Sequence, residues 1–97
     1  METQYQITEW ALNTFGTQPT VAIAARMNNE VSELLTGLTH EPDNTVELLA
    51  ECADIYIMLA QVATSLGGDL AEEVAKKMVI NAERTWTKTA SGKVQHV

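Results

Sequence analysis

Several features that define common protein classes are scarce in this 97-residue sequence. Its single cysteine, Cys52, excludes an internal disulfide. No apolar run reaches the length of about 18 residues that a membrane span needs, because Glu51 and Asp54 interrupt the longest candidate. No signal-peptide pattern is recognisable at the beginning of the sequence. We therefore expect a cytoplasmic protein with no membrane partner.

Positive charge is also scarce. Six lysines and arginines stand against 13 aspartates and glutamates, which gives a net charge of −7, and the largest basic cluster is Lys76-Lys77. Proteins that bind a nucleic-acid duplex normally present a basic surface to the phosphates. The sequence therefore predicts no duplex partner, and part of its acidity can serve as a metal site.

Apolar residues, by contrast, are plentiful, at 45% of the chain. Their helical spacing predicts an all-α protein, an antiparallel four-helix bundle with a single domain over residues 1–88 and a flexible C-terminal tail over residues 89–97. A chain this short buries only a modest core. We therefore expect a homo-oligomer, a dimer or a dimer of dimers, that completes the bundle between subunits.

Local signals place the ends of the four expected helices. The pair Thr3 and Gln6 fits an N-terminal capping box, and paired glycines or a proline mark the later breaks. The expected helices run from Thr3 to Gly16, from about Pro19 to Leu38, from Asn44 to Gly67, and from Asp69 to about Lys88.

The third of these helices carries an acidic pair in an apolar setting. Every residue from Cys52 to Ala60 is apolar or aromatic except Asp54. Glu51 and Asp54 stand three residues apart, so their side chains share one helix face at a spacing of about 5–6 Å. A carboxylate that leaves water without a partner either takes up a proton or acquires a cation. We therefore expect a positive group opposite Asp54.

A second acidic pair, Glu30 and Glu33, lies on the preceding helix. The short connection makes the two helices antiparallel, which brings the two pairs level with each other. Four carboxylates without histidine or cysteine favour Mg²⁺, with Mn²⁺ as a substitute. The alternative is two solvated helix faces joined by surface ion pairs.

The fourth expected helix carries a polar row of Lys77, Asn81 and Arg84. Lysine and arginine are the usual partners of phosphate oxygens, so this row is a candidate phosphate-binding surface, and an ordinary surface stripe is the alternative. Trp10 and Trp86 could stack on a nucleobase, although core packing is the commoner role of tryptophan.

Together these residues resemble a known family. Glu30-x-x-Glu33, then Glu51-x-x-Asp54, then Lys77, Asn81, Arg84 and Trp86 are similar to the pattern of the MazG-like all-α nucleoside triphosphate pyrophosphohydrolases, over roughly residues 19–86. The resemblance implies that the four acids bind Mg²⁺ and that the Lys77 row contacts the triphosphate. Asn29 departs from the pattern, because many relatives carry a further glutamate there.

The activity that the resemblance implies is attack of water on the α-phosphorus, which releases nucleoside monophosphate and pyrophosphate and would clean the nucleotide pool. One of the four carboxylates is an alternative general base for that water. Three other functions stay open: a phosphoribosyl-ATP pyrophosphohydrolase, a di-iron carboxylate bundle, and a non-enzymatic oligomer that binds nucleotide or partner proteins. The di-iron design uses Glu-x-x-His pairs, and the expected helices contain no histidine.

Overall fold

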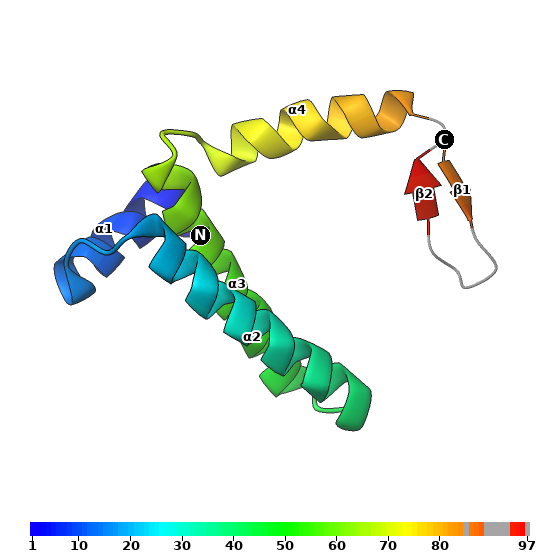
Figure 1. The fold of residues 1–97 in the computed structure, drawn as a ribbon, viewed down its shortest axis with the longest axis horizontal. Helices are drawn as coiled ribbons and strands as arrows, with labels where there is room; N and C mark the ends of the chain where they lie inside the picture. Colours follow the sequence, from blue (N-terminus) through cyan, green and yellow to red (C-terminus); the bar gives the residue numbers. More distant parts are fainter. Residues whose placement is uncertain (85, 89–93, 97) are drawn as a thin grey trace.

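Four helices account for most of the computed structural model, which describes residues 1–84, 86–88 and 94–96. The all-α class expected from the sequence is confirmed, and a short antiparallel hairpin follows the last helix (Figure 1). The elements are α1 (Gln4–Phe15), α2 (Thr20–His40), α3 (Thr45–Ser65), α4 (Leu70–Glu83), β1 (Trp86–Lys88) and β2 (Val94–His96). Within the described residues, no helix is both long enough and apolar enough to span a membrane.

The beginning and end of α1 follow the sequence signals. The Thr3 hydroxyl accepts a hydrogen bond from the Gln6 backbone N–H at 3.1 Å, and the Gln6 side chain accepts one from the Thr3 backbone N–H at 2.8 Å. This is the reciprocal pairing of a capping box. Gly16 follows the helix with φ of 74°, a conformation that glycine adopts without steric cost. The predicted cap is therefore confirmed.

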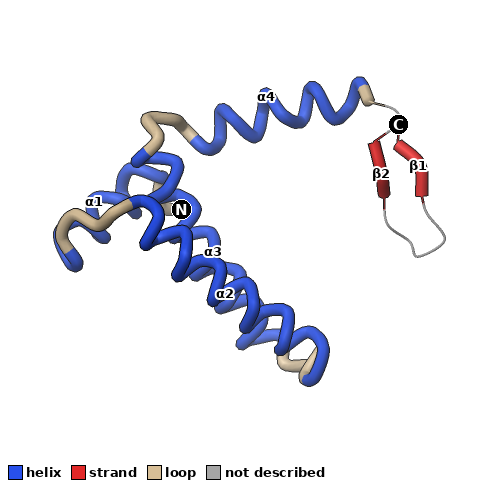
Figure 2. Tube along the Cα trace, in the orientation of Figure 1, coloured by secondary structure: helices blue, strands red, loops and turns tan. Residues whose placement is uncertain are grey.

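The long helices α2 and α3 run side by side as an antiparallel hairpin, and α1 packs against α3 at the end of the hairpin far from the α2–α3 loop (Figure 2). The two long helices approach closely at Gly37, where an added Cβ would lie 2.8 Å from Cδ2 of Leu48. This hairpin is the scaffold that brings the acidic residues of α2 and α3 together.

Helix α4 leaves the hairpin instead of packing along it (Figure 1). No residue of α4 is buried, and Val74 and Val79 are 52% and 61% exposed. Helical spacing in the sequence predicts a covered apolar face, but Val74 and Val79 are left uncovered within the single chain. The side-chain amide of Gln4 fixes the beginning of α4. Its Oε1 accepts a hydrogen bond from Leu70 N at 2.6 Å, and its Nε2 donates one to the carbonyl of Gly68, just before the helix, at 2.7 Å.

The fourth helix is also shorter than expected, because it ends at Glu83 instead of about Lys88. Arg84 already has an extended backbone, with ψ of 148°, and β-branched and aromatic residues follow it, which favour strands. Trp86–Lys88 accordingly pairs with Val94–His96, across the domain boundary expected at residue 88. Residues 89–93 and 97 of the expected tail lie outside the described residues, so the flexibility of the tail stays a prediction.

Candidate active site

Three acidic side chains converge between α2 and α3. Glu30 on α2 and Glu51 and Asp54 on α3 each offer a carboxylate oxygen, and these oxygens lie within 4.8 Å of one another. Glu30 and Glu51 are partly buried, whereas Asp54 is exposed. The antiparallel hairpin thus brings both acidic pairs level, as the short connection predicts.

Glu51 supplies the observation that points to a metal ion. Its Oε2 atom is buried and has no hydrogen-bond partner in the described part of the chain. A buried ionised oxygen without a partner is costly, and a cation is one means of satisfying it. The donors in this cluster are hard carboxylate oxygens, which suit Mg²⁺, Mn²⁺ or Ca²⁺. The residues therefore fit a divalent metal.

The electrostatics of Glu30 agree with that fit. A hydrogen bond with the Glu51 carboxylate, partial burial, and repulsion from Glu51 and Asp54 together raise the pKa of Glu30 above its ordinary value of 4.5, against a smaller opposing effect of a hydrogen bond with Glu33. The cluster therefore resists full ionisation without a cation. A bound divalent ion would offset the repulsion among these carboxylates.

Glu33 adjoins this cluster without belonging to the set of three. It is exposed, lies one turn further along α2 than Glu30, and its carboxyl group hydrogen-bonds with that of Glu30. All four predicted acids therefore occupy one region of the hairpin. Their role as metal ligands stays a prediction.

The residues predicted to bind phosphate are not brought to the acids within one chain. Lys77 and Asn81 belong to α4 and Arg84 caps its C-terminal end. This helix points away from the α2–α3 hairpin (Figure 1). Trp86 belongs to β1, and the predicted stacking of its side chain stays a prediction.

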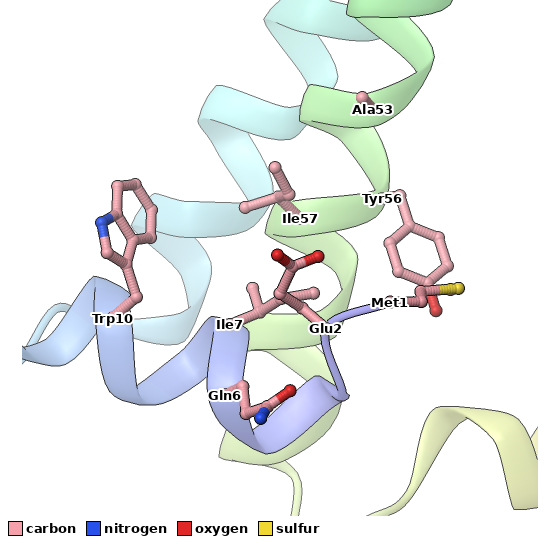
Figure 3. A pocket seen from close by; sticks show the side chains of 8 residues that line it. All are labelled: Met1, Glu2, Gln6, Ile7, Trp10, Ala53, Tyr56 and Ile57. Atoms are coloured by element: carbon pink, nitrogen blue, oxygen red, sulfur yellow. The ribbon is translucent and has the colours of Figure 1, made fainter.

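Trp10 does not pack in a core, because its side chain is 53% exposed. Its ring meets that of Phe15 edge to face, with centroids 5.5 Å apart and planes at 88°. Trp10 lines two cavities. The larger, of 550 Å³, lies between the beginning of the chain and α3, with Ile7, Tyr56 and Ile57 among its walls (Figure 3).

The second cavity beside Trp10 has a volume of 350 Å³ and adjoins the acidic cluster, because Asp54 lines it. Its other walls come from α1, α2, α3 and the α1–α2 loop: Trp10, Phe15, Gln18, Arg26, Ile57, Met58 and Gln61. The Arg26 guanidinium donates a hydrogen bond through Nη2 to Oε1 of Gln18.

Sequence reasoning did not assign Phe15, Gln18, Arg26 or Gln61 to a site. One signal was available, since Arg26 lies one turn before Glu30 on the same face of α2. The others carry no local pattern, because the fold of the α1–α2 loop decides where Gln18 lies.

Comparison with known proteins relates the chain to phage nucleotide enzymes. No family model matches the sequence. A dATP/dGTP diphosphohydrolase of Salmonella phage PMBT28 is 32% identical over 96 residues, which are 99% of this chain and 31% of that protein. A dATP/dGTP diphosphohydrolase of Cyanophage S-2L is 31% identical over 74 residues, which are 75% of this chain and 64% of that protein. The chain thus spans less than two thirds of either relative.

A solved structure is similar over almost the whole chain. It is a Cyanophage S-2L MazG-like pyrophosphohydrolase bound to dGDP and three catalytic Mn²⁺ ions per active site. The TM-score is 0.73 at 26% identity, and the match covers 97% of this chain and 92% of that one. The chain therefore belongs to the MazG-like family, and the all-α fold expected from the spacing of its apolar residues is confirmed.

Proposed function

Because its likenesses in sequence and fold place the chain in the MazG-like family, we propose that it is a metal-dependent nucleotide pyrophosphohydrolase. The proposed reaction converts a deoxynucleoside triphosphate to the monophosphate and pyrophosphate and removes unwanted nucleotides from the pool. The single observation that carries the proposal is the convergence of Glu30, Glu51 and Asp54, in which Oε2 of Glu51 is buried without a hydrogen-bond partner among the described residues. The names of the two phage relatives support the substrate class.

The proposed cofactor is Mg²⁺, with Mn²⁺ as a substitute. Of the four acids predicted as ligands, Glu30, Glu51 and Asp54 would hold it, and Glu33 adjoins them. When bound, the metal neutralises phosphate charge and orients the triphosphate, which supplies most of the catalysis in phosphoryl chemistry. The Mn²⁺ ions described for the similar structure support a divalent ion. The absence of histidine from the cluster argues against the di-iron alternative.

We assign the general base to Glu33. It is exposed, as Asp54 is, but it alone of the four acids stands outside the set of three, so its carboxylate is the one best placed to accept a proton from the attacking water. The other three acids offer oxygens within 4.8 Å of one another, which suits them to metal binding. The leaving pyrophosphate then departs with its charge neutralised.

The test is pyrophosphate release from the nucleoside and deoxynucleoside triphosphates, and from phosphoribosyl-ATP, with Mg²⁺ present. Wild type is expected to release pyrophosphate from deoxynucleoside triphosphates, and Glu51→Gln and Asp54→Asn are expected to release almost none. Asp43→Asn in the exposed α2–α3 loop is the matched control and should keep full activity. If the folded wild-type protein cleaves only phosphoribosyl-ATP, it is a phosphoribosyl-ATP pyrophosphohydrolase. If it cleaves none of these compounds, the non-enzymatic binding function is favoured instead.

We also propose that the working enzyme is a homo-oligomer in which α4 of one copy covers the α2–α3 hairpin of another. Isolated helices shorter than about 12–15 residues are marginal in water, and no residue of the 14-residue α4 is buried in its own chain. Apolar side chains are exposed on both surfaces: Val31, Leu35, Leu38, Val46 and Leu49 on the hairpin, and Val74, Met78, Val79 and Ile80 on α4.

Such an arrangement would let a neighbouring copy supply Lys77, Asn81 and Arg84 to the triphosphate. Within one chain, α4 carries these residues away from the acids (Figure 1), so the site would be incomplete in a monomer. Sedimentation at micromolar concentration is expected to show a dimer or a larger oligomer, and a purely monomeric active enzyme would contradict the proposal. Because the proposed substrates are cytoplasmic metabolites, the proposed location is the cytoplasm.

A further inference from the structure

The cavity beside Asp54 has chemistry that the metal site does not use. Its volume of 350 Å³ falls within the range of about 300–1,000 Å³ that small-molecule sites occupy. Trp10 and Phe15 give it an aromatic wall, and Asp54 belongs both to this cavity and to the acidic cluster. The base of a nucleotide whose phosphates lie at the acids could therefore reach into this cavity.

The polar rim of the cavity offers hydrogen-bond donors. Arg26 donates to Oε1 of Gln18, which orients the Gln18 carboxamide and occupies its acceptor atom. What remains available is the Nε2 group of Gln18, with two N–H bonds, and the other N–H bonds of the guanidinium, which has no acceptor at all. The Arg26–Gln18 pair is thus a donor surface.

An amide at the inner end of the cavity offers the opposite polarity. Gln61 on α3 is only 9% exposed, and its Nε2 donates to the Ile57 carbonyl of its own helix at 3.3 Å. One of its two Nε2 N–H bonds is engaged on the backbone, so Gln61 can offer a ligand the acceptor Oε1 besides its second N–H bond. The cavity therefore combines donors on one side with an acceptor on the other.

We propose that this cavity holds the base of the substrate and that the Arg26–Gln18 pair selects 6-oxopurines over 6-aminopurines. The inference rests on the proposed function and names its preferred base. Guanine presents two acceptors, O6 and N7, on one edge and N–H donors on the next, which matches the donor pair and Gln61. Adenine presents an amino group in place of O6, so a donor would meet a donor.

The first test compares kcat/KM of the wild type for dGTP, dITP, dATP and 7-deaza-dGTP. A bidentate contact of this kind discriminates by about tenfold or more. We expect dGTP and dITP to exceed dATP by about that factor, because both carry O6. Replacement of N7 by C–H in 7-deaza-dGTP should lower kcat/KM severalfold. Equal values for dGTP and dATP would overturn the proposal.

The second test separates base selection from phosphate binding. Arg26→Ala should lower kcat/KM for dGTP by about tenfold and leave that for dATP nearly unchanged. Arg26→Lys keeps the charge but loses the planar fork, so it should also lose the preference. Gln18→Glu replaces the Nε2 donor by an acceptor and should weaken dGTP selectively. An equal loss on both substrates in Arg26→Ala would assign Arg26 to the phosphates instead.

Arg26 is exposed and Gln18 only half-buried, so these variants should fold. Asp43→Ala in the exposed α2–α3 loop is the surface control. Binding distinguishes failure of this inference from failure of the proposed hydrolase. Quenching of tryptophan fluorescence by dGDP and by dADP, with Mn²⁺ present, reports occupancy without turnover. If the wild type binds dGDP more tightly than dADP and Arg26→Ala loses this difference, base selection is supported even if no triphosphate is cleaved. Equal binding of dGDP and dADP by the wild type would contradict it.

Discussion

The carboxylate of Glu51 lies against that of Glu30 across the α2–α3 interface, and Oε2 of Glu51 is buried without a hydrogen-bond partner in the part of the chain that the structure describes. Two acids in this relationship repel each other unless a proton or a cation stands between them. The stability of the metal-free protein, its affinity for divalent ions and its proposed activity are therefore linked through one pair of side chains.

The metal-free protein should lose stability as the pH rises. Contact with Glu51 raises the pKa of Glu30 above 4.5 in the folded state, so between 4.5 and the raised pKa the folded chain holds a proton that the unfolded chain has lost. The free energy of unfolding must then fall as the pH increases through that interval. Thermal denaturation in a chelator from about pH 4.5 to about pH 8 measures this effect.

Glu30→Gln is the matched variant for that experiment. Its side chain stays neutral, so the fall in melting temperature with pH should be smaller and the metal-free variant should be the more stable protein near neutral pH. Saturating Mg²⁺ should likewise flatten the profile of the wild type, since a cation replaces the proton. A wild-type profile that rises with pH in chelator would contradict the assigned interaction.

Removal of the Glu51 charge should abolish metal binding. In Glu51→Gln the atom facing the cluster is a neutral amide, so the rise in melting temperature that Mn²⁺ gives the wild type should disappear. Loss of a supporting residue around a metal typically costs about 10- to 100-fold in affinity or activity, and loss of a direct ligand should cost more. Unchanged stabilisation by Mn²⁺ would place the metal elsewhere.

Glu33→Gln should separate catalysis from metal binding. If Glu33 accepts the proton of the attacking water, the rate should fall by about 10²–10⁴-fold while Mn²⁺ still raises the melting temperature. Circular dichroism checks that helicity persists. A variant that loses the Mn²⁺ effect together with activity would identify Glu33 as a ligand instead of the base.

Gln4 should matter for stability well beyond its own helix. Its carboxamide bonds Thr64 of α3, the Gly68 carbonyl and the Leu70 backbone N–H, so it fixes α1 to the beginning of α4. Gln4→Leu should lower the free energy of unfolding by about 1–3 kcal/mol, because partly buried polar groups lose their partners. Gln4→Glu, which keeps an acceptor for Leu70 N but not the two donor bonds, should have a smaller effect in urea denaturation.

Mixed oligomers test whether neighbouring copies share a site. Glu51→Gln lacks an acid and Lys77→Ala lacks a phosphate contact, so each should be inactive alone or nearly so. If α4 of one copy serves the acids of another, co-refolding the two variants should restore a fraction of wild-type pyrophosphate release, because some sites receive an intact acid cluster and an intact α4. No recovery from verified mixed oligomers would contradict the shared site.

The sequence by itself determined what depends on short range along the chain. Capping chemistry placed the beginning of α1, and the spacing of three residues put Glu30 with Glu33 and Glu51 with Asp54 on common faces. The short connection then required antiparallel helices, which brought three of these carboxylates within 4.8 Å. Each step used local periodicity or a geometric constraint, so it needed no knowledge of distant contacts.

Only the tertiary structure decided the rest. The amphipathic pattern of α4 shows that a face should be covered but not by which chain, and the structure directs this helix away from its own hairpin (Figure 1). Strand pairing with Val94–His96 shortened α4, and the fold of the α1–α2 loop brought Gln18 to Arg26. Contacts between residues distant in the chain depend on the path of the backbone, and side-chain periodicity does not encode that path.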